Sequence, residues 1–131
     1  MTRYVIRPDV AMHLAGREAV IREELQLLAP TLLRSQLLSL LYQAHSRGEM
    51  TAKDARRQLD YVRGLRIRLL GDRALQSVAW KVAEQLGWPD TLDAEYVALT
   101  RLQGDALVTL DRKLAESVKG LVTVASVDAL S

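Results

Sequence analysis

The sequence contains no cysteine and no phenylalanine, and it has only two histidines, His13 and His45. The absence of cysteine excludes disulfide bonds, thiolate zinc sites and a cysteine nucleophile. Two histidines are too few for a three-histidine metal site. No apolar run approaches the ~18 residues that a membrane span needs, and the N-terminus lacks the basic and apolar regions of a signal peptide. We therefore expect a cytoplasmic protein with no membrane partner.

Glycine and proline are also scarce, with 7 and 3 residues among 131, and 49% of the residues are hydrophobic. This composition excludes collagen-like, low-complexity and wholly disordered chains. The 24 leucines and the 5% aromatic content favour helices over a β-sandwich. The net charge of +2 is too small to indicate a nucleic-acid partner by itself. The length is that of one domain, which we expect to occupy residues 1–131.

Short apolar segments alternate with amphipathic ones along the chain. The pattern predicts helices over residues 10–14, 17–28, 31–47, 52–63, 73–86, 91–102 and 112–118. It predicts short strands over residues 4–6, 65–69, 106–109 and 121–124, and a terminal helical turn over 127–130. Leu32 and Leu38 widen the apolar face of the 31–47 helix, so we expect that helix to be buried on most sides. The order of elements indicates an α/β protein, a three-layer α/β/α sandwich with a short central parallel sheet.

Ligands of open parallel sheets bind at the carboxyl ends of the strands, so polar residues there are candidate site residues. Arg7 and Asp9 follow the first predicted strand, Thr109 and Asp111 close the 106–109 strand, and Asp93 opens the helix before it. Each acid also has an ordinary structural role open to it. Asp111 and Asp9 suit helix capping, and Asp93 suits a first helical turn.

A basic stripe precedes and crosses the predicted strand at 65–69. It consists of Arg63, Arg66 and Arg68. Such a stripe either faces the phosphates of a nucleic acid or forms the solvated outer face of an edge strand. The sequence leaves both possibilities open.

Four segments make the chain resemble the PIN-domain family, in particular the VapC toxins of bacterial toxin–antitoxin systems. The first segment is the opening strand 4–6 with Val10-Ala11, which matches the first strand and turn of the family. The second is Ala29-Pro30 before the leucine-rich helix. The segment 91–99 carries an Asp and a following Tyr at a helix start, and the segment 107–114 is a strand followed by an Asp. The mutual spacing of the last two is the most specific part of the resemblance, which implies a single PIN-like domain over residues 1–131.

The resemblance implies an endoribonuclease that uses Mg²⁺ or Mn²⁺, held by a cluster of carboxylates, to activate water. By position, Asp93 and Asp111 correspond to two of the catalytic acids and metal ligands of the family. Hard divalent cations prefer carboxylate oxygens as ligands. The resemblance also implies RNA as substrate, a cognate antitoxin as partner, and a homodimer.

At four positions the sequence departs from the family pattern. Arg7 stands where the family has an Asp after the first strand, and Gln36 stands where it has a Glu in the leucine-rich helix. Ser39 replaces an Asn one turn later, and Asp9 replaces a small hydroxyl residue. Because two carboxylates are lost and one guanidinium is gained, the candidate site becomes much less negative.

Two hypotheses follow from these departures. In the first, Arg7 takes the electrostatic role of the metal beside Asp93 and Asp111, no metal is bound, and the fold serves binding through RNA, antitoxin or dimer contacts. In the second, Asp9 joins Asp93 and Asp111 as a third catalytic acid of a weakened nuclease. The residues that would then contact the substrate are Arg7, Gln36, Ser39 and Thr109. The sequence does not decide whether the protein is an enzyme.

Overall fold

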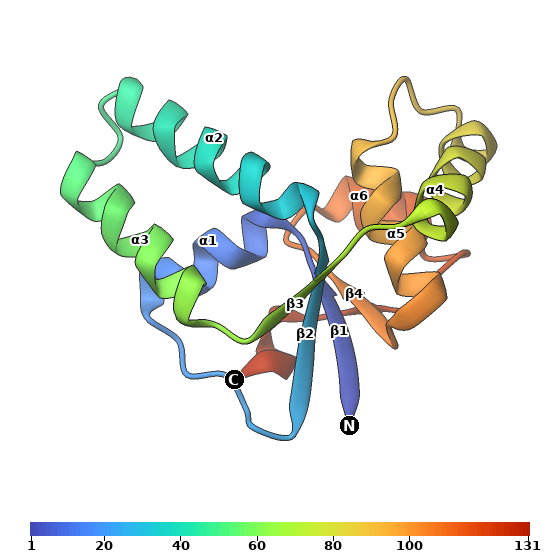
Figure 1. Ribbon diagram of the computed structural model, residues 1–131, viewed down its shortest axis with the longest axis horizontal. Helices are drawn as coiled ribbons and strands as arrows, with labels where there is room; N and C mark the ends of the chain where they lie inside the picture. Colours follow the sequence, from blue (N-terminus) through green and yellow to red (C-terminus); the bar gives the residue numbers. More distant parts are fainter.

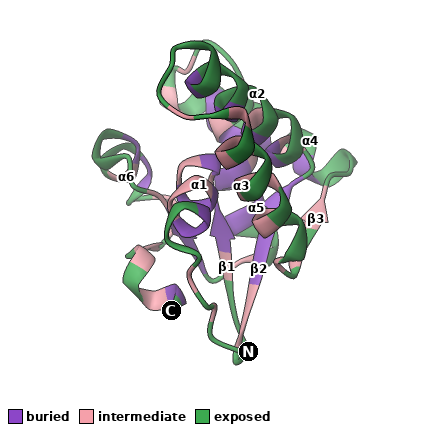
Figure 2. Ribbon diagram, turned by 90° about the vertical axis from the view of Figure 1, so that its left-hand side faces the viewer, coloured by how far each residue is buried: buried purple, intermediate pink, exposed green.

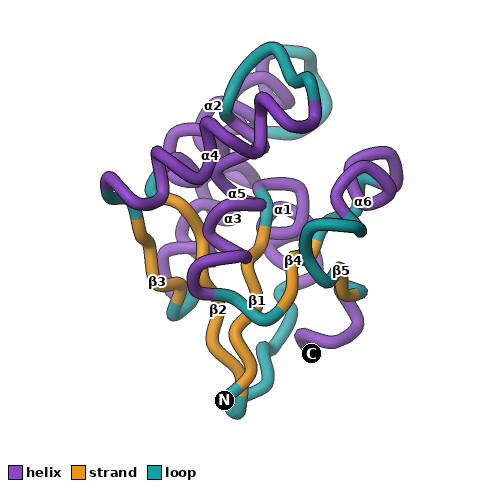
Figure 3. Tube along the Cα trace, turned by 90° about the vertical axis from the view of Figure 1, so that its right-hand side faces the viewer, coloured by secondary structure: helices purple, strands orange, loops and turns teal.

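A five-stranded parallel sheet forms the centre of the protein, which we describe from a computed structural model of residues 1–131 (Figures 1 and 3). Its strands are β1 (Thr2–Ile6), β2 (Leu25–Pro30), β3 (Ile67–Leu70), β4 (Ala106–Val108) and β5 (Val124–Ala125). They lie in the order β3-β2-β1-β4-β5, and every neighbouring pair is parallel. Strand β1 is therefore central. Strands β2 and β3 lie on one side of it, and β4 and β5 lie on the other.

Helices cover both faces of this sheet (Figure 1). One face carries α1 (Pro8–Arg17), α2 (Leu32–Ser46), α3 (Ala52–Gly64) and the 3₁₀ helix η1 (Val127–Leu130). The other carries α4 (Arg73–Leu86), α5 (Leu92–Gln103) and α6 (Arg112–Val118). The predicted three-layer α/β/α sandwich is therefore confirmed. None of the helices is both long and apolar enough to cross a membrane.

Consecutive strand residues send their side chains to opposite helical layers, since side chains alternate across a strand. Val5 packs with α4 and α5, whereas Ile6 packs with α1 and α2, and both are fully buried. Leu28 and Leu27 divide in the same way. Burial on both faces explains why the strand sequences are continuously apolar, and Figure 2 shows the buried residues concentrated on the sheet and its facing helices.

Local signals fix most helix ends. The Thr51 side chain accepts a hydrogen bond from the Asp54 amide at the start of α3, and Asp72 accepts one from the Leu75 amide at the start of α4. Gly48 and Gly87 adopt positive φ angles of 77° and 66° after α2 and α4. These left-handed positions suit glycine because it has no Cβ. The predicted helices 52–63 and 73–86 are confirmed nearly to the residue.

The predicted helix over residues 17–28 is wrong. The α1 helix continues to Arg17 and ends at Glu18, which has a φ of 48°, and a connecting segment then leads into strand β2. Leucines suit a helix as readily as a buried strand, and Glu18 gives no glycine signal for the left-handed turn. The segment Leu25–Pro30 forms a strand because it pairs with β1 along one edge and with β3 along the other.

Three smaller expectations are also corrected. The last strand is Val124–Ala125 rather than residues 121–124, because only these two residues pair with β4. The first helix spans Pro8–Arg17 rather than residues 10–14, since Pro8 occupies its first turn. The α2 helix is not buried on most sides, because Leu38 is 56% exposed on its outer face.

Candidate functional site

The candidate site lies at the carboxyl ends of β1 and β4, where the strand order reverses. Parallel sheets form a crevice at such a switch point because the connections leave the two strands in opposite directions. Arg7 follows β1 directly and precedes α1, and Thr109 follows β4. The first turn of α5 adds Asp93 from the other helical layer. The tertiary structure thus brings together three segments that are far apart in the sequence.

The Arg7 guanidinium lies between these three segments and contacts the other two. Its Nη2 donates to Asp93 Oδ1 at 2.7 Å, and its Nη1 donates to Thr109 Oγ1 at 3.3 Å. The same Nη1 lies 3.4 Å from Asp9 Oδ2. Only 15% of the Arg7 side chain is exposed, and its Nε is buried without a hydrogen-bond partner. The pairing of Arg7 with Asp93 that the first hypothesis requires is therefore present.

Asp9 is held in place by several hydrogen bonds. Its Oδ2 accepts from the Leu110 amide at 2.9 Å and from the Thr109 hydroxyl at 3.2 Å, and its Oδ1 accepts from the Val10 amide at 2.9 Å. Thr109 Oγ1 also accepts from the Asp111 amide at 3.0 Å. Asp9 therefore ties the end of β4 to the start of α1, and both of its carboxylate oxygens are engaged.

Asp111 sits beside this network without contacting Arg7. Its Oδ1 accepts from the Leu114 amide at 3.1 Å, so it is the N-cap of α6, which the sequence allowed as its structural role. Asp111 and Asp93 are among the residues that line a cavity of about 250 Å³, together with Asp90 and Lys113. The two acids named by the resemblance thus face a common space, but Arg7 neutralises one of them.

Gln36 is hydrogen-bonded to Tyr96, which is not among the site residues predicted from the sequence. The Tyr96 hydroxyl donates to Gln36 Oε1 at 2.6 Å, and Tyr96 itself is fully buried. The sequence signal for it was its place one turn after Asp93 on α5, which puts both side chains on one face of the helix. Ser39 is not part of this network; it is exposed, and its Oγ accepts only from Gln43 Nε2 at 3.1 Å.

Burial raises the pKa of the Tyr96 phenol well above its usual value, and the Arg7 guanidinium opposes only part of that shift. The unfolded chain therefore releases this proton near pH 10, whereas the folded chain retains it. Stability from Tyr96 is complete below pH 10 and is lost as the pH rises further. We expect Tyr96→Phe to cost about 1 kcal/mol at pH 7, from the lost hydrogen bond, and to flatten the fall in unfolding free energy above pH 10. Urea unfolding from pH 7 to 11 tests this, and an unchanged alkaline slope would contradict it.

The carboxylates of the site do not fit the divalent metal that the resemblance implies. No group of three or more Asp, Glu, His or Cys side chains is placed to hold a metal ion. Of the acids nearest the crevice, Asp93 is paired with Arg7, and both oxygens of Asp9 accept hydrogen bonds. Gln36 contributes a neutral oxygen that Tyr96 already engages. A permanent guanidinium charge in the crevice would repel a cation there.

Comparisons with known proteins identify the fold. No protein-family model and no curated protein matches the sequence. Among solved structures, the chain is similar to PAE2754 from Pyrobaculum aerophilum, with a TM-score of 0.75 and 26% identity over 97% of this chain and 90% of that one. It is also similar to VapBC2 from Rickettsia felis bound to a DNA fragment from their promoter, with a TM-score of 0.69 and 10% identity over 95% and 98% of the two chains. These similarities show that the fold is PIN-like.

Proposed function

We propose that this chain is a single VapC-like PIN domain that acts in the cytoplasm by binding rather than by metal-dependent RNA cleavage. The observation that supports this most is the 2.7 Å contact between Arg7 Nη2 and Asp93 Oδ1. It places a cation of the chain itself beside the acid that corresponds to a metal ligand in the family. The site then has its counter-charge at all times and needs no ion.

The energetics of this ion pair favour its persistence. A divalent cation that used Asp93 would have to displace a guanidinium that is only 15% exposed. Displacement would leave a largely buried charge without its partner, which costs several kcal/mol when burial is complete. It would also break the Arg7 contact with Thr109, which links β1 to β4. The architecture thus stabilises the state that lacks a metal.

The competing function is a weakened ribonuclease that uses Mg²⁺ or Mn²⁺. The observation in its favour is that Asp93 and Asp111 line the same cavity. It requires Arg7 to turn outward to RNA phosphate and Asp9 to leave its two amide hydrogen bonds. It also requires Gln36 to give up Tyr96. Because existing interactions of all three residues would have to break, we prefer the binding function.

Partners follow from the same proposal. The similarity to the Rickettsia VapBC2 complex supports a protein partner of the antitoxin kind, and RNA and a second copy of the chain are further candidates. An antitoxin that inserted its own arginine beside Asp93 would meet the charge of Arg7. We therefore expect a cognate partner to bind outside the crevice.

Calorimetric titration with Mn²⁺ and Mg²⁺ tests the proposed function. We expect no saturable heat from the parent chain and no difference for Asp93→Asn, since Arg7 already neutralises Asp93. Asp60→Asn, on the exposed side of α3, controls for nonspecific ion binding. A saturable heat that Asp93→Asn abolishes, accompanied by RNA cleavage that a chelator stops, would establish the weakened nuclease instead.

A further inference from the structure

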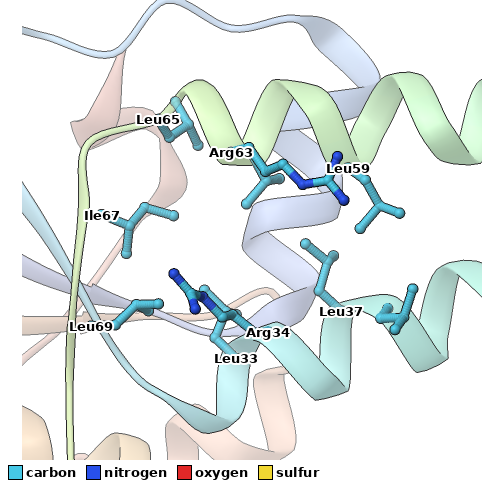
Figure 4. Close-up of a pocket in the computed structure, with 10 residues that line it drawn as sticks. Leu33, Arg34, Leu37, Leu59, Arg63, Leu65, Ile67 and Leu69 are labelled. Carbon is cyan, nitrogen blue, oxygen red and sulfur yellow. The ribbon is translucent and has the colours of Figure 1, made fainter.

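A second feature of the protein lies away from the crevice, between α2, α3 and β3. It is a groove of about 460 Å³, and eight of its ten lining residues are hydrophobic (Figure 4). Leu33 and Leu37 are buried and line the α2 side of the groove, and Leu59 and Val62 line the α3 side. Ile67 of β3 closes one end. This volume lies within the range of roughly 300–1,000 Å³ that is typical of ligand-binding clefts.

The α3 helix is incompletely covered in the isolated chain. None of its 13 residues is buried, although its sequence has an apolar face. Its Leu59 and Val62 are only half-buried, as are Leu65 and Ile67 beyond it. Across the groove, Leu38 is 56% exposed. Apolar surface gathered from three elements and left open to water is characteristic of an interaction site.

The α2 and β3 sides of the groove carry basic residues and no acidic ones. Arg34 and Arg63 stand among the lining residues. No Asp or Glu occurs in residues 25–48 or 61–71, the segments that hold α2 and β3. Arg34 makes no ion pair, and Arg63 pairs only with Asp60, with both side chains more than 70% exposed. Exposed pairs of this kind are weak, so the cationic rim is available to an acidic partner.

We propose that this groove docks an apolar segment of a partner protein that carries acidic residues at its flanks. Helix-in-groove recognition supplies the apolar contacts, and the two arginines select the acidic flanks. RNA fits less well, because the lining residues include no aromatic side chain on which a base could stack. The groove does not involve Arg7 or Asp93, so this proposal goes beyond the proposed function and does not depend on it.

The three isoleucines of the chain make the test direct. Ile67 lines the groove, Ile6 is fully buried in the sheet, and Ile21 lies outside the groove. The protein carries ¹³C-labelled isoleucine methyl groups and is titrated with a synthetic helical peptide that has leucines at i, i+3, i+4 and i+7 and glutamates at its flanks. We expect the Ile67 methyl signal to shift saturably, while the Ile6 and Ile21 signals stay in place.

Variants and control peptides make the result specific. Leu38 and Arg34 are both exposed. Each of Leu38→Glu and Arg34→Glu is expected to weaken peptide binding at least tenfold. Arg73, on α4, is also exposed, and Arg73→Glu is expected to change peptide binding less than twofold. A lysine-flanked peptide and a scrambled peptide of the same composition should bind at least tenfold more weakly than the glutamate-flanked one.

Four results would overturn the proposal. Two of them are an Ile67 methyl signal that does not shift at millimolar peptide and equal binding of the scrambled or lysine-flanked peptides. A shift with protein concentration alone would assign the groove to a second copy, and tighter binding of an oligouridine would assign it to RNA. Because the metal titration uses the other site, a failure here leaves its outcome unaffected, and RNA cleavage by the parent chain would leave this proposal intact.

Discussion

Replacing Arg7 with aspartate and Gln36 with glutamate is expected to convert a chain that ignores Mn²⁺ into one that binds it. The double substitution removes the guanidinium and adds one carboxylate beside Asp93 and a second beside the Tyr96 hydroxyl. Without metal, the added negative charges repel one another, so the variant should be less stable than the parent chain. With metal, these charges become ligands, since hard divalent cations prefer clustered carboxylate oxygens.

Thermal unfolding with and without Mn²⁺ measures this effect. At a metal concentration 100 times Kd, binding adds about 2.7 kcal/mol, which raises the Tm of a domain of this size by roughly 10 °C. The parent chain should show no such rise. Adding Asp93→Asn to the double variant should abolish it, which separates the crevice from nonspecific sites. If the double variant stays insensitive to Mn²⁺, the crevice differs from a metal site in more than its charges, and the role assigned to Arg7 is wrong.

The second large effect concerns the stability of the crevice itself. Arg7→Ala is expected to cost about 2 kcal/mol, between the values for exposed and fully buried ion pairs, because Arg7 is 15% exposed and Asp93 is 41% exposed. The loss has two causes. Asp93 and Asp9 lose a counter-charge, and the link between β1 and Thr109 disappears.

A double-mutant cycle with Arg7→Ala and Asp93→Ala isolates the pair. We expect a coupling free energy of about 1 to 2 kcal/mol from urea unfolding. The matched control is Arg57 with Glu18, which also joins distant segments at 2.7 Å but with 46% and 65% of the side chains exposed. Its coupling should not exceed about 0.5 kcal/mol. Equal coupling in the two cycles would show that Arg7 is an ordinary surface arginine.

Most of the secondary structure followed from local sequence, and the largest exception, strand β2, has a clear cause. The helices beginning after Thr51, Asp72 and Asp111 carry side-chain caps, and each was predicted close to its observed start. Strand β2 has no such mark, because its Leu25–Pro30 sequence suits a helix as well as a strand. Only its pairing with β1 and β3 makes it a strand, and that pairing is not encoded locally.

In the candidate site too, the sequence indicates some of the residues but not the contacts between them. Arg7 and Asp93 were named from their positions at element ends, yet they are 86 residues apart in the sequence. Their hydrogen bond arises because α5 packs against β1 on the face opposite α1. The contact of Tyr96 with Gln36 spans 60 residues and was not foreseen, because neither residue alone indicates a partner. Leu38 shows the converse, since the leucine pattern predicted burial that no neighbouring element provides.

By itself, the sequence determined the alternation of strands and helices apart from β2, the parallel sheet and the presence of an arginine among the candidate acids, because composition, periodicity and caps act over a few residues. The tertiary structure decided which strand lies between which, which acid Arg7 contacts, and which leucines stay exposed beside the arginines of the groove. These depend on contacts between segments that meet only when the chain is packed, and no local preference specifies such contacts.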